Sequence, residues 1–150
     1  MKRFVTGLFV LSFVVPSLAA AGTPPFEPTL QSIQDNVFSP RCAQSFCHGA
    51  AVSANLDLRE GQSFSFLVDV TSVEVPPQKR VEPFAPDDSY LICKLENCPT
   101  IVGQQMPIIG GFLLQEEIDV IRDWISAGAP QFPSISVEGE NWGRVKAMYR

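Results

Sequence analysis

Apolar and polar residues recur along the chain in patterns that predict short helices separated by long loops. The clearest pattern runs from Gln115 to Ala127, where four apolar residues lie on one helical face and charged residues fill most other positions. Those apolar residues are Ile118, Ile121, Trp124 and Ile125. Gly128 favours the left-handed backbone that ends a helix, and Pro130 prevents the helix from resuming. The sequence therefore predicts a helix that ends at about Ala127.

A weaker helical pattern begins after Thr29, a residue type that commonly caps helix N-termini. Its apolar positions are Leu30, Ile33, Val37 and Phe38. We expect Pro40 to stop this helix, because proline lacks the backbone N–H and its ring clashes with the preceding turn. A further short helix is expected near residues 60–67.

The middle of the chain predicts one more helix and an extended segment. Asp87 is expected to accept backbone N–H bonds at the start of a helix over Ser89–Glu96. Residues 68–75 are rich in β-branched side chains but end at two prolines, which indicates an extended strand or loop. The fold class predicted is all-α, with about three to five short helices and long loops.

The N-terminal residues carry the pattern of a secretory signal peptide. Lys2 and Arg3 precede an almost wholly apolar run over residues 4–15, and small residues follow Pro16. The apolar run is shorter than the roughly 20 residues that a membrane-spanning helix needs. We expect cleavage near Ala21 and a periplasmic or otherwise exported product with no transmembrane segment after removal.

The expected organisation is then a signal peptide over 1–21, an extended leader over 22–28, one domain over 29–130 and a tail over 131–150. The formal net charge of the 150-residue chain is −5, and removing Lys2 and Arg3 makes it −7. An acidic chain argues against nucleic-acid binding, which needs basic side chains against phosphate. With 45% hydrophobic residues, the chain has enough apolar surface to form a core.

The cysteines carry the most specific chemical pattern. They form two equally spaced pairs, Cys42 with Cys47 and Cys93 with Cys98, and the only histidine of the chain, His48, directly follows Cys47. Two thiols followed at once by a histidine are the pattern of covalent haem attachment, in which the thiols add to the haem vinyl groups and the imidazole binds the iron. The usual spacing is two residues between the cysteines. Here four residues separate Cys42 from Cys47, so the segment that bridges the two cysteines must bulge by two residues to keep the sulfurs in place.

A second axial ligand must come from another residue type, because His48 has no histidine partner. After signal removal the thioethers are Met106 and Met148. Met106 precedes Pro107, which restricts it to extended backbone in a loop between two predicted helices. Met106 is therefore the candidate sixth ligand; the alternative is a methionine that fills the core.

The order of these segments resembles a bacterial class I cytochrome c domain. The resemblance rests on the Cys–Cys–His element, Pro86-Asp87-Asp88-Ser89-Tyr90-Leu91, Met106-Pro107 and the last helix with its Gly128-Ala129 end, and covers residues 30–130. It implies a small helical fold around one covalently bound haem c, with the first and last helices crossing. Cys42 and Cys47 would hold the thioethers, and His48 and Met106 the iron. The longer bridge departs from the family, as does Leu114 at the expected cap position.

The implied function is single-electron transfer by an exported monohaem cytochrome, an electron carrier or haem-binding subunit rather than a stand-alone enzyme. Redox partner proteins with a basic docking patch would suit its acidic surface. Candidate cations for the haem propionates are Arg41, Arg59, Lys79 and Arg80. Expected wall residues are Phe38, Phe46, Leu56, Phe64, Leu91, Ile108 and Trp124.

The second cysteine pair is not needed for haem. Cys93 and Cys98 flank the end of a predicted helix, and we expect a local disulfide that pins the following loop towards Met106, as export permits; free thiols are the alternative. Two other hypotheses stay open. One is a non-redox secreted helical module with a Cys42–Cys47 disulfide, and the other is a zinc module that uses all four cysteines.

Overall fold

The computed structural model describes residues 23–133. This part of the chain is all-α, as predicted, and holds no β-sheet, only isolated bridges between Val68 and Val81 and between Thr71 and Lys79. The elements, in chain order, are α1 (Leu30–Ile33), η1 (Gln34–Cys42), η2 (Ser53–Asn55), α2 (Ser63–Leu67), η3 (Pro86–Asp88), α3 (Tyr90–Glu96) and α4 (Gln115–Ser126). The predicted signal peptide and tail residues 134–150 lie outside the described residues.

The first helix begins as predicted but does not end at Pro40. The Thr29 hydroxyl accepts the backbone N–H of Ser32 at 3.2 Å, which confirms the N-cap. After Ile33 the chain continues as a π-helix, η1, that includes Pro40 and ends at Cys42. A π-helix pairs each N–H with the carbonyl five residues earlier, as in the Ala43-to-Phe38 bond of 2.7 Å. This wider turn accommodates the proline, so the prediction of a stop at Pro40 was wrong.

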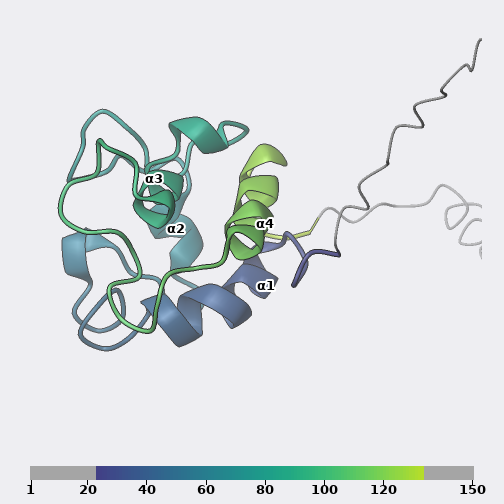
Figure 1. Ribbon diagram of the computed structural model, residues 1–150, viewed down its shortest axis with the longest axis horizontal. Helices are drawn as coiled ribbons and strands as arrows, with labels where there is room; N and C mark the ends of the chain where they lie inside the picture. Colours follow the sequence, from purple (N-terminus) through teal and green to yellow (C-terminus); the bar gives the residue numbers. More distant parts are fainter. Residues whose placement is uncertain (1–22, 134–150) are drawn as a thin grey trace, which may run out of the picture.

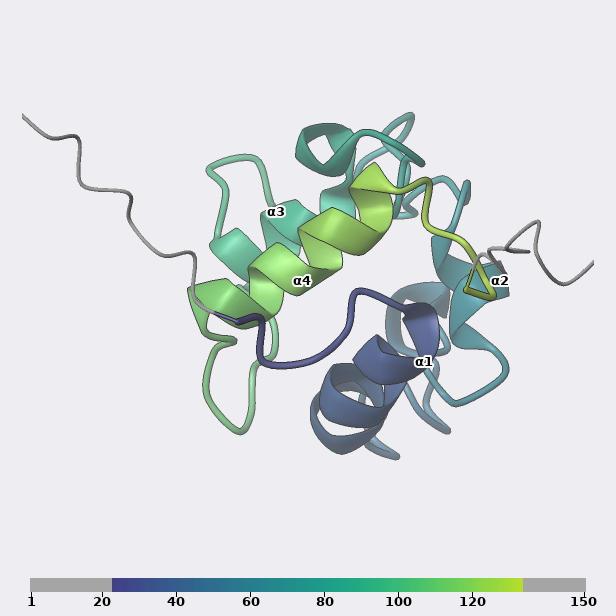
Figure 2. The same cartoon turned by 90° about the vertical axis from the view of Figure 1, so that its right-hand side faces the viewer.

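The last helix, α4, buries one face in the core. Its four predicted apolar residues are buried, and Trp124, Ile121 and Ile125 are fully so. Helix α4 packs against both α1 and α3, as Figures 1 and 2 show from two directions. Gly128 has φ +94°, which confirms the predicted left-handed end. Leu114 cannot cap the helix with its side chain, but Glu117 accepts the Leu114 backbone N–H at 2.8 Å and so supplies half of a capping box.

Helix α3 differs from the prediction at its start. Ser89 is the N-cap residue, and no side-chain capping bond forms there. Asp87 lies in η3 and accepts a hydrogen bond of 2.6 Å from Arg122 of α4, so its predicted capping role was wrong. Arg122 also forms a two-pronged pair with Glu96 at the end of α3. One guanidinium therefore joins α4 to both ends of the η3–α3 segment.

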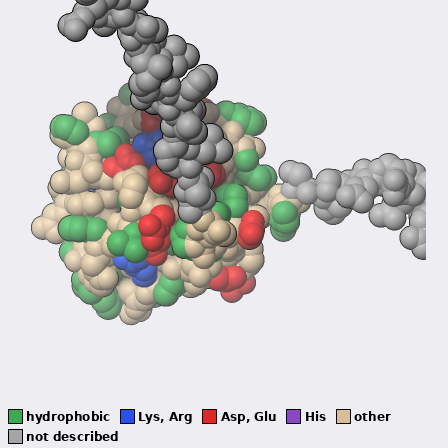
Figure 3. All heavy atoms as spheres, turned by 45° about the vertical axis from the view of Figure 1, so that its right-hand side comes forward, with side chains coloured by type: hydrophobic (Ala, Val, Ile, Leu, Met, Phe, Trp, Pro, Cys, Tyr) green, Lys and Arg blue, Asp and Glu red, His purple; other side chains and the backbone are tan. Residues whose placement is uncertain are grey.

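Residues 68–85, between α2 and η3, form a loop with turns and two isolated bridges rather than a sheet, so of the strand or loop predicted for residues 68–75 the loop is observed. Helix α2 is shorter than the expected 60–67. No helix among residues 23–133 is both long enough and apolar enough to cross a membrane. On the face drawn in Figure 3, hydrophobic side chains of the described residues lie in small separate groups between polar atoms. The larger apolar side chains of α1, η1, α3 and α4 are packed inside.

Candidate functional site

The four predicted haem-site residues line one cavity of about 610 Å³. Cys42 is the last residue of η1, Cys47 and His48 lie in the turn that follows, and Met106 lies in the long loop between α3 and α4. Residues from two distant parts of the chain, 42–48 and 106, therefore line one hollow. Its volume falls in the range of about 300–1,000 Å³ that is typical of small-molecule and cofactor sites.

Backbone hydrogen bonds shape the long bridge between the two cysteines. The N–H of Cys47 donates to the Gln44 carbonyl at 2.9 Å, and the N–H of His48 donates to the Cys42 carbonyl at 3.2 Å. The second bond spans the bridge and brings its two ends together. Gly49 closes the turn, because a Cβ at this position would lie 2.4 Å from the Ala43 carbonyl oxygen. The two extra residues thus form an ordered bulge that requires glycine at position 49.

His48 is held in the form that binds metals. Its Nδ1 lies 3.0 Å from the Ser53 carbonyl oxygen, and a carbonyl can only accept, so Nδ1 carries the hydrogen. The lone pair is then on Nε2, which is the common arrangement of metal-binding histidines. Burial lowers the pKa of His48, with the Ser53 bond opposing it. A neutral imidazole is the ligand form of this side chain.

Both cysteines of the bridge are free thiols, and each is half-buried at the cavity wall. Burial raises the pKa of the Cys42 thiol to about 12, partly opposed by the neighbouring Arg41 guanidinium. Because the thiolate is the reactive form in disulfide exchange, Cys42 is chemically quiet towards other disulfides in this state.

Met106 is fixed through its backbone to the end of α3. Its N–H donates to the Lys94 carbonyl at 2.8 Å, and the side chain of the preceding Gln105 donates to the Leu95 carbonyl at 2.6 Å. Met106 itself is half-buried and lines the cavity rather than the core.

Two of the four predicted propionate cations line the cavity, Arg41 and Arg80. Arg59 and Lys79 do not line the cavity; Arg59 pairs with Asp57, and Lys79 with Asp69 and Glu82. Arg80 is only 6% exposed and donates to the Phe66 and Ala54 carbonyls, each at 2.8 Å.

One charged residue that lines the cavity, Lys94, was not predicted from the sequence. Its ammonium donates to the Val102 carbonyl at 2.7 Å and lies 3.5 Å from Glu74. Lys94 follows Tyr90 by four residues in α3, and both line the cavity. This i, i+4 spacing was the available signal, because residues four apart share a helix face.

Five of the seven residues predicted for the haem wall line this cavity: Phe38, Phe46, Leu56, Leu91 and Ile108. Phe64 instead lines a separate hollow of about 110 Å³ beside α1. Trp124 is fully buried in the core, and its indole N–H donates to the Pro130 carbonyl at 3.0 Å.

The second cysteine pair forms a disulfide between Cys93 and Cys98, as predicted. Cys42 and Cys47 are the free cysteines of the described residues. Within residues 23–133 no three or more histidine, cysteine or carboxylate side chains gather into a metal-binding group.

No protein-family model, curated protein or solved structure significantly matches this chain. The site must therefore be interpreted from its own chemistry. Two free thiols, an imidazole with an available Nε2, a thioether and a buried guanidinium share the wall of one largely apolar cavity. These are the groups that a covalently attached haem requires, so the residues present fit that cofactor.

Proposed function

We propose that this chain is an exported monohaem c-type cytochrome of the class I type that transfers single electrons. One observation carries the proposal: Cys42, Cys47, His48 and Met106, chosen for their chemistry, line the same cavity. Residues 42–48 and 106 are far apart in the sequence. A methionine with an ordinary core role has no reason to meet the cysteine bridge and the only histidine of the chain.

Each group has a distinct role towards the haem. The thiols of Cys42 and Cys47 would each add across one vinyl group, with the sulfur bonding one carbon and the hydrogen going to the other. His48, through Nε2, and Met106, through its sulfur, would hold the iron. The bound haem supplies a reversible one-electron couple at its iron. A thioether ligand and an apolar surrounding both favour a raised potential.

Arg80 supports an acidic cofactor in this cavity. No carboxylate of the described residues pairs with Arg80, and its two carbonyl partners leave a full positive charge in a buried position. Burial lowers the pKa of Arg80, and the charge of Glu74, which lines the same cavity, opposes this effect. A buried charge without a direct ion-pair partner is costly, and a haem propionate would supply such a partner.

Exposed apolar side chains surround part of the cavity and offer a contact surface for redox partners. Phe46, Ile108 and Ile109 line the cavity and are 63%, 58% and 59% exposed. The net charge, −7 once Lys2 and Arg3 are removed with the signal peptide, would draw a partner with a basic patch, and salt would slow this association. The proposed role is that of a carrier or a haem-binding subunit rather than a stand-alone enzyme.

The proposal is tested by producing the chain in the periplasm of a bacterium that has cytochrome maturation machinery. Haem should stay attached in a denaturing gel, where its peroxidase activity stains the band. Cys42→Ser with Cys47→Ser should abolish the stain. Cys93→Ser with Cys98→Ser is the matched control, because it removes the same number of sulfurs away from the cavity and should keep the stain.

The axial ligand is tested separately. Met106→Ala should remove the near-infrared absorption of a thioether-bound ferric haem, lower the midpoint potential and open the iron to cyanide. Ile108→Ala removes a neighbouring wall residue and should change none of these three properties strongly. A stained protein whose spectrum and potential are unaffected by Met106→Ala would refute the ligand assignment, and an unstained wild-type chain would refute the proposal as a whole.

A further inference from the structure

We propose that the Cys93–Cys98 disulfide is the positioning element for Met106, so that reduction of this disulfide releases the sixth ligand. The release of the iron ligand rests on the proposed function, because it needs a bound haem. The structural part of the inference, the control of the Met106 position, concerns the polypeptide alone and can be tested without haem.

The disulfide closes the end of α3. Cys93 lies in the helix, Asn97 follows it with left-handed backbone at φ 59°, and Cys98 comes next. The Cys98 N–H also donates to the Cys93 carbonyl at 3.1 Å. Covalent and hydrogen bonds therefore fix the same turn, in which the chain reverses to enter the loop that carries Met106.

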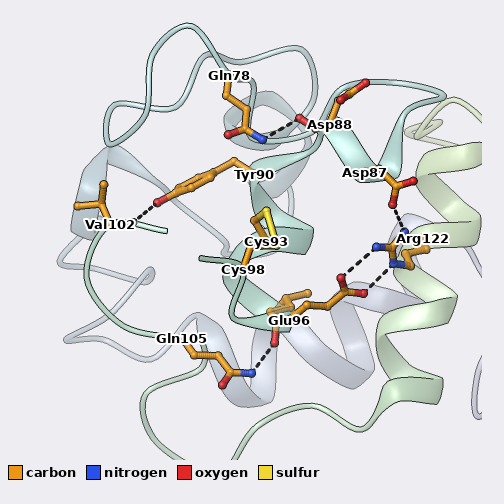
Figure 4. The surroundings of a disulfide bond; sticks show 11 residues. Gln78, Asp87, Asp88, Tyr90, Cys93, Glu96, Cys98, Val102, Gln105 and Arg122 are labelled. Carbon is orange, nitrogen blue, oxygen red and sulfur yellow. Dashed lines mark hydrogen bonds and ion pairs between the residues drawn. A yellow bond between two sulfur atoms is a disulfide. The ribbon is translucent and has the colours of Figure 1, made fainter. Parts of the chain in front are cut away.

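That loop returns to α3 and is joined to it by four hydrogen bonds, one of which is the bond from the Lys94 ammonium to the Val102 carbonyl. The Val102 N–H donates to the Tyr90 hydroxyl at 2.9 Å, and the Gln105 side chain donates to the Leu95 carbonyl at the helix end (Figure 4). The Met106 N–H donates to the Lys94 carbonyl. The acceptors that hold Gln105 and Met106 are carbonyls of the same helical turn that the disulfide closes.

Helix α3 has only seven residues, and helices of this length are not stable without outside support. Arg122 supports it through Glu96, and the disulfide supports it through Cys93. If the disulfide opens, the last turn can fray, and the Lys94 and Leu95 carbonyls lose their fixed positions. The global effect should be modest, because the disulfide closes a short loop. The local effect should fall on Met106.

The chemical step needs an external dithiol. One thiolate of the dithiol attacks a sulfur of the Cys93–Cys98 bond to form a mixed disulfide, and its second thiol then displaces the protein sulfur. The protein gains two electrons and two protons and holds two thiols, while the dithiol becomes a disulfide. Cys93 and Cys98 are both half-buried, and their neighbours Asn97 and Pro99 are exposed, so a small dithiol has access.

The test measures amide hydrogen exchange in the haem-free full chain, with and without dithiothreitol. Reduction should lower the protection of the Met106 N–H by about tenfold relative to Ile121, whose position in α4 reports global opening. Cys93→Ser with Cys98→Ser should show the same loss and no further response to dithiothreitol. Gln105→Ala, which leaves the cysteines intact, should lower Met106 protection in part.

In the haem-loaded protein, the double serine variant should bind cyanide at the ferric iron about tenfold faster than wild type, since opening at Met106 becomes the limiting event. Equal protection of Met106 in oxidised and reduced protein would overturn the inference. So would a parallel loss at Met106 and Ile121, because that result assigns the disulfide a general stabilising role. If haem never attaches but the Met106 exchange changes as expected, the proposed function fails and the positioning role stands.

Discussion

Arg41 precedes the first cysteine of the bridge and offers a sharp test of how the cavity is held together. Its guanidinium donates to both carboxylate oxygens of Glu117, at 3.1 and 3.0 Å, and to the Gly111 and Phe112 carbonyls, each at 2.9 Å. The Arg41 and Glu117 side chains are 21% and 18% exposed. One side chain thus joins the end of η1 to the start of α4 and to the loop that follows Met106.

Arg41→Gln should lower the free energy of unfolding by about 2 kcal/mol. A hydrogen bond to a charged group contributes about 1.5–3 kcal/mol when buried, and exposed ion pairs contribute about 0–1 kcal/mol. The four bonds of Arg41 lie between these limits. Lys79→Gln is the matched control, because its carboxylate partners are more exposed, and it should cost less than about 1 kcal/mol.

Urea unfolding of four proteins completes the test: wild type, Arg41→Gln, Glu117→Gln and the double variant. The double-mutant cycle should give a coupling energy of about 1–1.5 kcal/mol between Arg41 and Glu117. Glu117→Gln keeps an oxygen for the Leu114 N–H, so the helix cap is largely retained. A coupling below about 0.3 kcal/mol would show that the two variants act independently, and the proposed link between η1 and α4 would be wrong.

Three further predictions concern single residues. The Arg122 guanidinium lowers the pKa of Glu96, so the pair stabilises the fold above the ordinary carboxyl pKa, and this stability is lost as the pH falls through the lowered value. Glu96→Gln should therefore lower the free energy of unfolding by about 1 kcal/mol near pH 7, and a loss that persists at pH 2 would contradict the assignment. Gly49→Ala should cost about 2 kcal/mol in unfolding experiments, since the added Cβ meets the Ala43 carbonyl; an unchanged midpoint would refute the tight turn. Arg80→Gln should lower the haem midpoint potential measured by voltammetry, because a buried positive charge favours the reduced iron, and Arg80→Lys should keep the potential close to that of wild type. Equal midpoint potentials in wild type and Arg80→Gln would place Arg80 away from the haem.

Local signals predicted the parts of the fold that depend on nearby residues. The face of α4 follows from its own spacing, and the Thr29 cap acts within one turn. The predicted helix stop at Pro40 was wrong because the choice between an α- and a π-helix depends on packing around η1 rather than on the proline alone. The predicted capping role of Asp87 was wrong because Arg122, 35 residues away, binds the carboxylate that would otherwise accept the backbone N–H groups of the helix.

Chemistry predicted the candidate site better than pattern did. Cys42, Cys47, His48 and Met106 were chosen by what a haem needs, and they line one cavity. Wall and charge predictions were less accurate, because any apolar residue or surface cation fits those roles. Trp124 was predicted to line the site for this reason but lies in the core, and Lys94 was not predicted because lysines are seldom buried.

The haem itself is tested most directly by mass spectrometry of one peptide. Trypsin cuts after Arg41 and after Arg59, which releases residues 42–59 with both bridge cysteines and His48. From a host with cytochrome maturation machinery, this peptide should carry the mass of one haem and absorb visible light. The same peptide at its plain mass, or two hydrogens lighter through a Cys42–Cys47 disulfide, would contradict the proposed cytochrome.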